Sequence, residues 1–370
     1  MIKTLTTIAL VLLCALSTSA QESPSASKDE GTETSLFQAQ LVEVHKIWTP
    51  DRHCMSTDLV RYRGQWFCRF QNRNPSLGET QISIIHSKDG RSWKSAAMLS
   101  KAGFPSSRFT VKSNEHLMLF SAVRSGDPKA KDRSIGWSSQ DGFDWTAYEP
   151  TIEGDFRLSR MAWHEDRWFG VAEGHKTRRS TTSLVTTTDG KTFKTHVPDF
   201  PTGLFYEPSI VFSQRDTAFC LLSMWRNAEQ IKPHAQVGSA VSPYRKWSWK
   251  QLDEWLVDPN MIVLPDNRLV VAGRKYDPST SLAFRKLSQI TLWSLEPVSG
   301  KLTEMLSLRS GSDLFTCGSP GLVWYDDHLW ISYNSSHELN SSKSRTLIYL
   351  AKVKLTETGG TDNRKRRTNR

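Results

Sequence analysis

The sequence predicts an all-β protein made of six copies of one unit, on three observations. A box of the form Ser/Thr-x-Asp-Gly-x-x-aromatic occurs three times, as SKDGRSW (87–93), SQDGFDW (139–145) and TTDGKTF (187–193). The aspartates of these boxes lie 52 and 48 residues apart, a period typical of repeat folds. Helical periodicity is nearly absent, and β-rich runs flank polar turns throughout. Three to four strands per unit favour a six-bladed β-propeller, with a pair of β-sandwiches as the alternative.

Each unit contains a hairpin, in which a polar turn separates two apolar runs. The hairpins are STDLVRYRGQWFCRF (56–70), SRFTVKSNEHLMLFSAV (107–123), LSRMAWHEDRWFGVA (158–172), EPSIVFSQRDTAFCLLSM (207–224), DPNMIVLPDNRLVVAG (258–273) and SPGLVWYDDHLWISY (319–333). A third strand follows each hairpin, and the box, where present, follows that strand. The last unit lacks a fourth strand after Leu355, so we expect residues 39–48 to supply it and close the ring.

The repeated box predicts a structural turn. Asp89, Asp141 and Asp189 can accept backbone N–H bonds across the turn, while glycine supplies the positive φ that the turn needs. The aromatic residue can pack between neighbouring blades. A structural turn is needed in several blades, whereas an active site is needed only once, so we expect these three aspartates to be structural. Later units carry degraded boxes at 241–249 and 293–302, which indicates that the fold tolerates their loss.

Both ends of the chain lie outside the predicted propeller, which spans residues 37–357. Residues 1–20 combine Lys3 with a short apolar run and small residues, which predicts a signal peptide and a secreted or periplasmic protein without a membrane anchor. Residues 21–36 predict a disordered spacer, and residues 358–370 predict a disordered basic tail. Part of the net charge of +10 comes from this tail.

The cysteines give no indication of a metal site. Cys54, Cys68, Cys220 and Cys317 follow the predicted signal peptide and show no CxxC or CxxH spacing, so we predict no metal and no cofactor. Export would permit disulfides, but the wide scatter of these residues favours buried thiols.

The functional residues of a propeller are expected on one rim of the central axis, where the inner strands begin and the second strands end. These positions are rich in arginine, with some carboxylates and aromatics. Arginine binds carboxylate or sulfate through two parallel bonds, so we expect an acidic, sugar-like ligand and no nucleic acid. The alternative is that these arginines pair with acids between blades. The predicted substrate-binding residues are His53, Arg160, Arg226, Arg274, Tyr333, Asn334 and His337.

Residues 48–355 resemble the sialidase-like propellers in their boxes and their six-blade phasing. A closer resemblance is to secreted bacterial proteins identified as exo-alpha-sialidases or glycosyl hydrolases. Residues 56–68, 87–99, 259–277, 320–338 and 348–355 carry it. Sialidases hold the substrate carboxylate with three arginines and use a tyrosine nucleophile, a glutamate base and an aspartate acid/base. The resemblance implies that Glu207 is the glutamate, Arg226 the second arginine, and Arg274 or Arg285 the third.

Two parts of the sialidase pattern are missing. Where the first arginine is expected, the chain reads Met55-Ser56-Thr57-Asp58. Where the tyrosine is expected, it reads Cys317-Gly318-Ser319-Pro320. The resemblance therefore does not extend to the first arginine and the nucleophile of the sialidase mechanism.

The sequence therefore predicts a monomeric, secreted glycoside hydrolase that acts on an acidic or substituted glycan. Its carboxylate pair would be Glu207 with Asp58 or Glu173. Three alternatives remain open. They are a carbohydrate-binding propeller without catalysis, an exo-alpha-sialidase with a relocated nucleophile, and a scaffold that binds polyanions through the basic tail.

Overall fold

The structure of the chain is a computed structural model that describes most residues between Leu36 and Thr358. The described ranges are 36–51, 53–73, 80–102, 107–112, 115–123, 133–153, 156–176, 179–198, 200–201, 204–226, 234–275, 289–310, 317–339 and 345–358. The predicted signal peptide, nearly all of the predicted spacer and the basic tail lie outside these residues.

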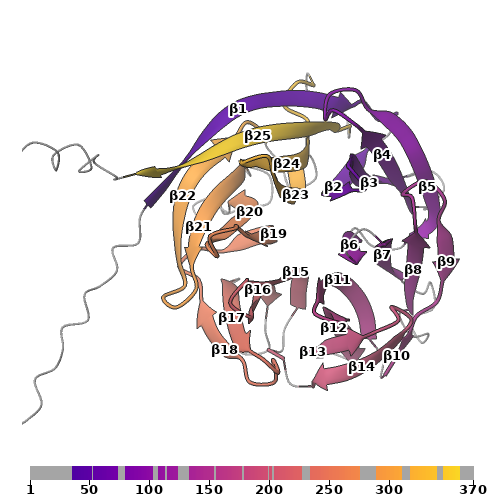
Figure 1. Ribbon diagram of the computed structural model, residues 1–370, viewed down its shortest axis with the longest axis vertical. Helices are drawn as coiled ribbons and strands as arrows, with labels where there is room; N and C mark the ends of the chain where they lie inside the picture. Colours follow the sequence, from indigo (N-terminus) through magenta and orange to yellow (C-terminus); the bar gives the residue numbers. More distant parts are fainter. Residues whose placement is uncertain are drawn as a thin grey trace, which may run out of the picture. The chain divides into compact units, whose positions relative to one another are not determined.

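Six antiparallel sheets stand around a central axis as the blades of a propeller (Figure 1). Blade 1 consists of β2 (Cys54–Tyr62), β3 (Gln65–Arg73), β4 (Thr80–Ser87) and β5 (Lys94–Ala102). Blade 2 consists of β6 (Arg108–Lys112), β7 (His116–Val123), β8 (Arg133–Ser139) and β9 (Thr146–Tyr148). Blade 3 consists of β11 (Phe156–His164), β12 (Arg167–Lys176), β13 (Arg179–Thr187) and β14 (Thr192–Val197). Blade 4 consists of β15 (Leu204–Phe212), β16 (Thr217–Arg226), β17 (His234–Val241) and β18 (Ser248–Gln251). Blade 5 consists of β19 (Leu256–Val263), β20 (Leu269–Lys275), β21 (Ile290–Glu296) and β22 (Lys301–Leu308). Blade 6 consists of β23 (Cys317–Tyr325), β24 (His328–Ser335), β25 (Leu347–Thr358) and β1 (Leu36–Trp48). A short strand, β10 (Thr151–Ile152), pairs in parallel with β14. The prediction of an all-β, six-bladed propeller is confirmed.

The ring is closed by the first strand of the chain. β1 pairs antiparallel with β25 from Leu36↔Thr358 to Trp48↔Ile348, as Figure 1 shows where the indigo and yellow strands run together. The expected closure by residues 39–48 is therefore confirmed. Because the first and last described strands, β1 and β25, belong to one blade, opening the ring requires breaking this long ladder.

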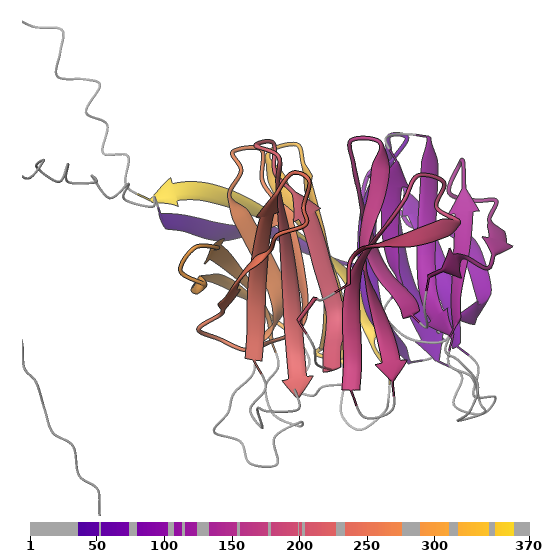
Figure 2. The same cartoon turned by 90° about the horizontal axis from the view of Figure 1, so that it is seen from below.

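The two faces of the propeller differ in their connections, and Figure 2 shows the strands running between them. We call the face at which inner strands β2, β11, β15, β19 and β23 begin the entry face. We call the face at which each inner strand turns into its second strand the hairpin face. Turn residues such as Arg63, Glu165 and Asp326 have positive φ there, which the predicted hairpin turns require.

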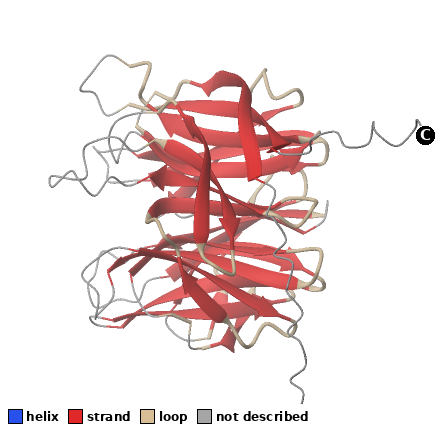
Figure 3. Cartoon of the chain, turned by 90° about the vertical axis from the view of Figure 1, so that its left-hand side faces the viewer, coloured by secondary structure: helices blue, strands red, loops and turns tan. Residues whose placement is uncertain are grey.

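The hydrophobic core consists of six clusters, one at each seam between neighbouring blades. At the seam of blades 1 and 2, for example, Phe67 and Ile84 pack with Phe109 and Leu119. Each blade packs against a neighbouring blade on both of its faces, which explains the near-continuous apolar runs in its strands. The described residues form strands and loops without a helix (Figure 3), and hence no described helix is long and apolar enough to cross a membrane.

The repeated Asp-Gly box closes the turn between the third and fourth strands. In the first copy, Asp89 Oδ1 accepts the backbone N–H groups of Arg91 and Ser92, both at 2.8 Å. Ser87 Oγ donates to the same carboxylate at 2.9 Å and accepts the N–H of Gly90. Asp141 and Asp189 make the same bonds within their own turns. The carboxylates are thus engaged locally.

The aromatic residue of each box fills a seam. Trp93 packs at the seam of blades 6 and 1, Trp145 at that of blades 1 and 2, and Phe193 at that of blades 2 and 3. In blade 4, where the box is degraded, Trp247 Nε1 still donates to a turn carbonyl, that of Tyr244, at 2.9 Å. Trp247 also packs against the cluster at the seam of blades 3 and 4, so the seam contact persists where the aspartate is absent.

Glycine substitution in the boxes should separate backbone strain from packing. Gly90 and Gly142 both have positive φ, so alanine should cost roughly 1–2 kcal/mol at either site. A Cβ at Gly142 would also overlap the buried Phe67 ring, whereas a Cβ at Gly90 would make ordinary contacts. We expect Gly142→Ala to lower the unfolding free energy by about 1–3 kcal/mol more than Gly90→Ala in urea titrations. Equal losses would contradict the packing argument.

The same boxes predict an acid-sensitive component of stability. Backbone N–H bonds hold the pKa of Asp89 and Asp141 below the ordinary 3.8. At Asp189 burial acts to raise the pKa, but bonds from the turn outweigh it and lower the pKa to about 2. Folded carboxylates therefore bind protons more weakly than unfolded ones, so their stabilisation is present above about pH 4 and is lost as the pH falls through the folded values.

A variant with all three aspartates changed to asparagine should show the effect. Its unfolding free energy should fall less than that of the parent protein between about pH 5 and pH 2, as measured by urea unfolding at several pH values. Parallel pH profiles for the two proteins would show that these turns do not titrate with folding.

Candidate functional site

Five of the six inner strands carry the same β-bulge near the entry face. At each bulge two residues oppose one on the second strand. The bulges are 56–57, 159–160, 207–208, 258–259 and 319–320. The second position is proline in blades 4, 5 and 6, which suits a bulge because proline cannot donate to a ladder. The sequence prediction did not include this bulge, although the repeated Glu-Pro, Asp-Pro and Ser-Pro pairs mark it.

Polar side chains join one inner strand to the next, just after the bulge in blades 1, 4 and 5 and from the bulge-free strand β6 in blade 2. The inner strands of neighbouring blades belong to separate sheets, so their backbone groups at the axis need other partners. These bonds are Asp58 Oδ2 with Phe109 N at 2.7 Å, Thr110 Oγ1 with Met161 O at 3.0 Å, Ser209 Oγ with Met261 N at 3.1 Å, and Asn260 Nδ2 with Pro320 O at 2.9 Å. We call them the inner-strand latches.

Blade 6 solves the same problem differently. Its residue after the bulge is Gly321, where a Cβ would overlap the backbone nitrogen of Leu59. Blades 6 and 1 therefore approach closely, and Thr57 Oγ1 reaches back to the carbonyls of Ser319 and Ser332 at 3.1 and 2.9 Å.

Asp58, one of the predicted catalytic carboxylates, belongs to a latch. It is 2% exposed, accepts the N–H of Phe109, and lies 3.6 Å from Arg108 Nη1. Arg108 Nη1 in turn donates to Thr57 O at 2.6 Å. A carboxylate held in this way joins blades 1 and 2, and the geometry favours a structural role for it.

Arg160, predicted to bind substrate, reaches across the axis. It is the second bulge residue of β11, and its Nη1 donates to Asn260 Oδ1 in blade 5. The same nitrogen lies 3.5 Å from Ser209 Oγ in blade 4. These two partners are an amide and a hydroxyl, so Arg160 links blades 3, 4 and 5 through polar groups.

Arg274 forms an ion pair with Asp258 in its own blade. The side chains are 5% and 18% exposed, and Asp258 is the first bulge residue of β19. Arg274 lies near the end of β20, opposite Val257. The carboxylate thus orients the guanidinium near the entry face. Arg285, the other candidate for this role, lies outside the described residues.

The predicted residues of blade 6 lie mostly in the wall. Tyr333 is 1% exposed, and its ring stacks on Tyr349 with centroids 5.4 Å apart. Asn334 is also buried, and its Nδ2 donates to Cys54 O at 3.4 Å. His337 is half-buried, and its Nδ1 lies 2.8 Å from Ser335 Oγ. Burial lowers the pKa of His337.

For Glu207 and Arg226 the structure describes the backbone position but not the side chain. Glu207 is the first bulge residue of β15, and Arg226 is the last residue of β16, opposite Leu204. Their side chains lie outside what the structure describes. Glu173, half-buried, stands near the end of β12 in the neighbouring blade 3, and His53 is half-buried before β2. Glu207 and Glu173 therefore come from adjacent blades at the entry face.

Other titratable clusters of the described residues have structural partners. His164, Glu165 and Asp216 bring ligand atoms within 4.8 Å of one another at the hairpin face. Asp216 Oδ1 accepts from His164 Nε2 at 2.9 Å and from the hydroxyl of Tyr244, so these groups tie blades 3 and 4 together.

The cysteines that the structure describes with their side chains are buried thiols. They are Cys54, Cys68 and Cys220. Burial raises the pKa of Cys68 to about 12, which makes its thiol unreactive. The side chain of Cys317 lies outside the described residues.

Solved structures with a similar fold include a sialidase, an arabinanase and an arabinofuranosidase. The Trypanosoma rangeli sialidase in complex with sialic acid has a TM-score of 0.58 at 11% identity, over 85% of this chain and 58% of its own. The Penicillium chrysogenum alpha-L-arabinanase complexed with arabinobiose has a TM-score of 0.59 at 11% identity, over 86% and 98%. The Fusarium graminearum alpha-L-arabinofuranosidase with an iminosugar inhibitor has 0.59 at 11%, over 85% and 97%.

This similarity establishes the fold. The chain has the six-bladed propeller of the sialidases and arabinanases, and it spans little more than half of the sialidase. No protein-family model matches the sequence, and no curated protein matches it.

Removing the Asp58 latch should destabilise the protein. Asp58→Ala would leave Arg108 buried without its carboxylate and Phe109 N without an acceptor, at a cost of about 3–5 kcal/mol. Asp166→Ala, at an exposed hairpin, is the control and should change the unfolding free energy by no more than about 0.5 kcal/mol. Urea unfolding measures the change in unfolding free energy of both variants. If the Asp58 variant were as stable as the control, the latch would contribute little.

Proposed function

We propose that the chain is a glycoside hydrolase whose active site lies on the axis at the entry face. The observation that carries this proposal is the placement of Glu207 at the bulge of β15, in a fold shared with sialidases and arabinanases. In blade 5 the equivalent bulge residue is Asp258, whose carboxylate binds the Arg274 guanidinium near this face. A β-bulge also changes the direction of a side chain, and bulges are frequent next to active sites.

Glu207 and Glu173 are the proposed carboxylate pair. Hydrolysis of a glycosidic bond requires one carboxylic acid to protonate the leaving oxygen, and one carboxylate to attack the sugar or activate water. Asp58 is engaged by Phe109 and Arg108, and Asp258 by Arg274. Glu173 is half-buried near the end of β12, in the blade next to Glu207 and at the same face, whereas Asp58 is buried in a latch, so Glu173 is the proposed second carboxylate.

The proposed substrate is an anionic or substituted glycan. Arg274, oriented by Asp258, and Arg226 at the end of β16 would hold its negative charge. Known proteins of this fold include one solved with sialic acid and one solved with arabinobiose, so a neutral arabinose-containing glycan is the competing substrate. Export by the sequence-predicted signal peptide would bring the protein to such glycans.

A sialidase mechanism with a relocated tyrosine is disfavoured. Ser319 stands at the bulge of β23, is 3% exposed, and accepts Thr57 Oγ1 through its carbonyl. Tyr333 is buried against Tyr349 and points its hydroxyl toward Arg309 O at 3.5 Å. A nucleophile must reach the substrate, and a side chain packed in the seam of blades 5 and 6 does not.

Substitution of Glu207 tests the proposal. The purified protein would be assayed on sialosides, uronic-acid oligosaccharides, sulfated glycans and arabinan. On any substrate that it cleaves, Glu207→Gln should lower kcat/KM by about 10²–10⁴-fold, and Glu173→Gln by a comparable factor. Glu304→Gln, on the outer strand β22, is the matched control and should retain full activity.

The same panel separates catalysis from binding alone. If no glycan is cleaved but Glu207→Gln weakens binding of one of them, the chain is a carbohydrate-binding propeller. If Glu207→Gln changes neither cleavage nor binding, the proposed site is wrong. If Glu173→Gln kept full activity while Asp58→Asn lost activity without losing stability, Asp58 would be the second carboxylate instead of Glu173.

A further inference from the structure

The axis contains a cavity on the side that faces away from the proposed active site. Its volume is about 570 Å³. The lining follows β2 from Asp58 to the turn at Arg63 and Gly64, and β23 from Leu322 to Tyr325. Both stretches lead toward the hairpin face, whereas the bulge that holds Glu207 lies near the start of β15. This hairpin-face cavity is therefore distinct from the entry-face site.

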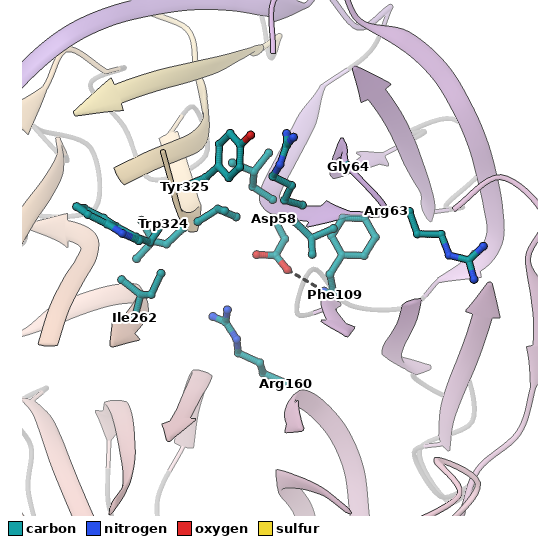
Figure 4. A pocket seen from close by; sticks show the side chains of 13 residues that line it. Asp58, Arg63, Gly64, Phe109, Arg160, Ile262, Trp324 and Tyr325 are labelled. Carbon is teal, nitrogen blue, oxygen red and sulfur yellow. Dashed lines mark hydrogen bonds between the residues drawn. The ribbon is translucent and has the colours of Figure 1, made fainter. Parts of the chain in front are cut away.

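The polar groups of the cavity converge on its floor. Figure 4 shows the Arg160 guanidinium and the Asp58 carboxylate pointing into it from opposite sides. Asp58 is 2% exposed, and its Oδ1 has no hydrogen-bond donor among the described residues, the nearest cation being Arg108 Nη1 at 3.6 Å. A buried acceptor without a donor is costly, so a ligand hydroxyl placed there would be favourable.

The mouth of the cavity is cationic and aromatic. The guanidinium of Arg61 stacks 3.8 Å from the ring centroid of Tyr325 and 5.1 Å from that of Trp66. This stacking holds the planar cation in place at the wall. Trp324 and Ile262 supply apolar surface, as Figure 4 shows. Among the described residues that line the cavity, Arg61, Arg63 and Arg160 are cationic and Asp58 is anionic and also faces Arg108, so positive charge dominates.

We propose that the hairpin-face cavity binds a small anionic sugar. Its carboxylate or sulfate would lie between Arg61 and Arg160, one hydroxyl would donate to Asp58 Oδ1, and its apolar face would rest on Trp324. The volume falls in the range of small-molecule pockets, which is about 300–1,000 Å³. Arginine pairs with either anion through two bonds, and an aromatic ring covers the C–H face of a sugar. The site is separate from the proposed catalytic function and does not depend on it.

Calorimetric titration of the full chain tests the site, with D-glucuronate, D-glucose 6-sulfate, D-glucose and inorganic sulfate as probes. The two anionic sugars should bind, and their relative affinities distinguish carboxylate from sulfate. Glucose lacks the anion and sulfate lacks the hydroxyls, so each should bind at least about tenfold more weakly.

Variants locate the binding. Arg61→Gln should raise the Kd of the anionic sugars about tenfold or more, because it removes one charged donor. Tyr325→Glu, which adds a negative charge at the exposed edge of the cavity, should raise it further. Arg167→Gln, at the hairpin of blade 3, is the matched control and should leave the Kd unchanged. Thermal unfolding of each variant shows whether a change in affinity reflects lost folding.

The entry-face variant separates this proposal from the catalytic one. Glu207→Gln should leave the Kd of the anionic sugars unchanged, and Arg61→Gln should leave any hydrolysis unchanged. The proposal is overturned if no probe binds at millimolar concentration, or if glucose binds as well as glucuronate. Loss of binding in Glu207→Gln, with Arg61→Gln unaffected, would also overturn it, because the sugar would then occupy the entry face.

Discussion

The constraint on which this structure depends is the unpaired edge of every inner strand. Each blade is a separate sheet, so the strand nearest the axis has backbone groups that no ladder satisfies. The latches answer this need with side chains: Asp58 binds Phe109 N, Ser209 binds Met261 N, and Asn260 binds a carbonyl of blade 6. Together with the six apolar seams, they join the blades around the axis.

This constraint decides which polar residues near the axis are available for chemistry. In blades 1, 4 and 5 the side chain just after the bulge bonds to the inner strand of the next blade, as Asp58 does. The first bulge residue of blade 5, Asp258, is partly exposed and binds Arg274, whereas Ser56 and Ser319 at the same position of blades 1 and 6 are buried. Polar character near a propeller axis is therefore not by itself a sign of catalysis.

The latches also divide the axis between two faces. Arg160 extends from blade 3 to Asn260 in blade 5, so polar side chains occupy the middle of the channel. Toward the hairpin face lies a cavity with its own arginines and aromatic rings. A propeller can thus offer two chemically different ends of one axis, because each end is lined by a different stretch of the same inner strands.

The sequence by itself determined the blades. The repeated boxes, the hairpin pattern and the period near 50 residues predict six blades and closure by residues 39–48, because strand alternation and turn chemistry are local properties. It also placed Glu207 on an inner strand. Only the tertiary structure showed that Asp58 is a latch and that Tyr333 is buried in a seam. Those fates depend on contacts with other strands, Phe109 of the next blade for Asp58 and Tyr349 of the neighbouring strand for Tyr333, which form only in the folded ring.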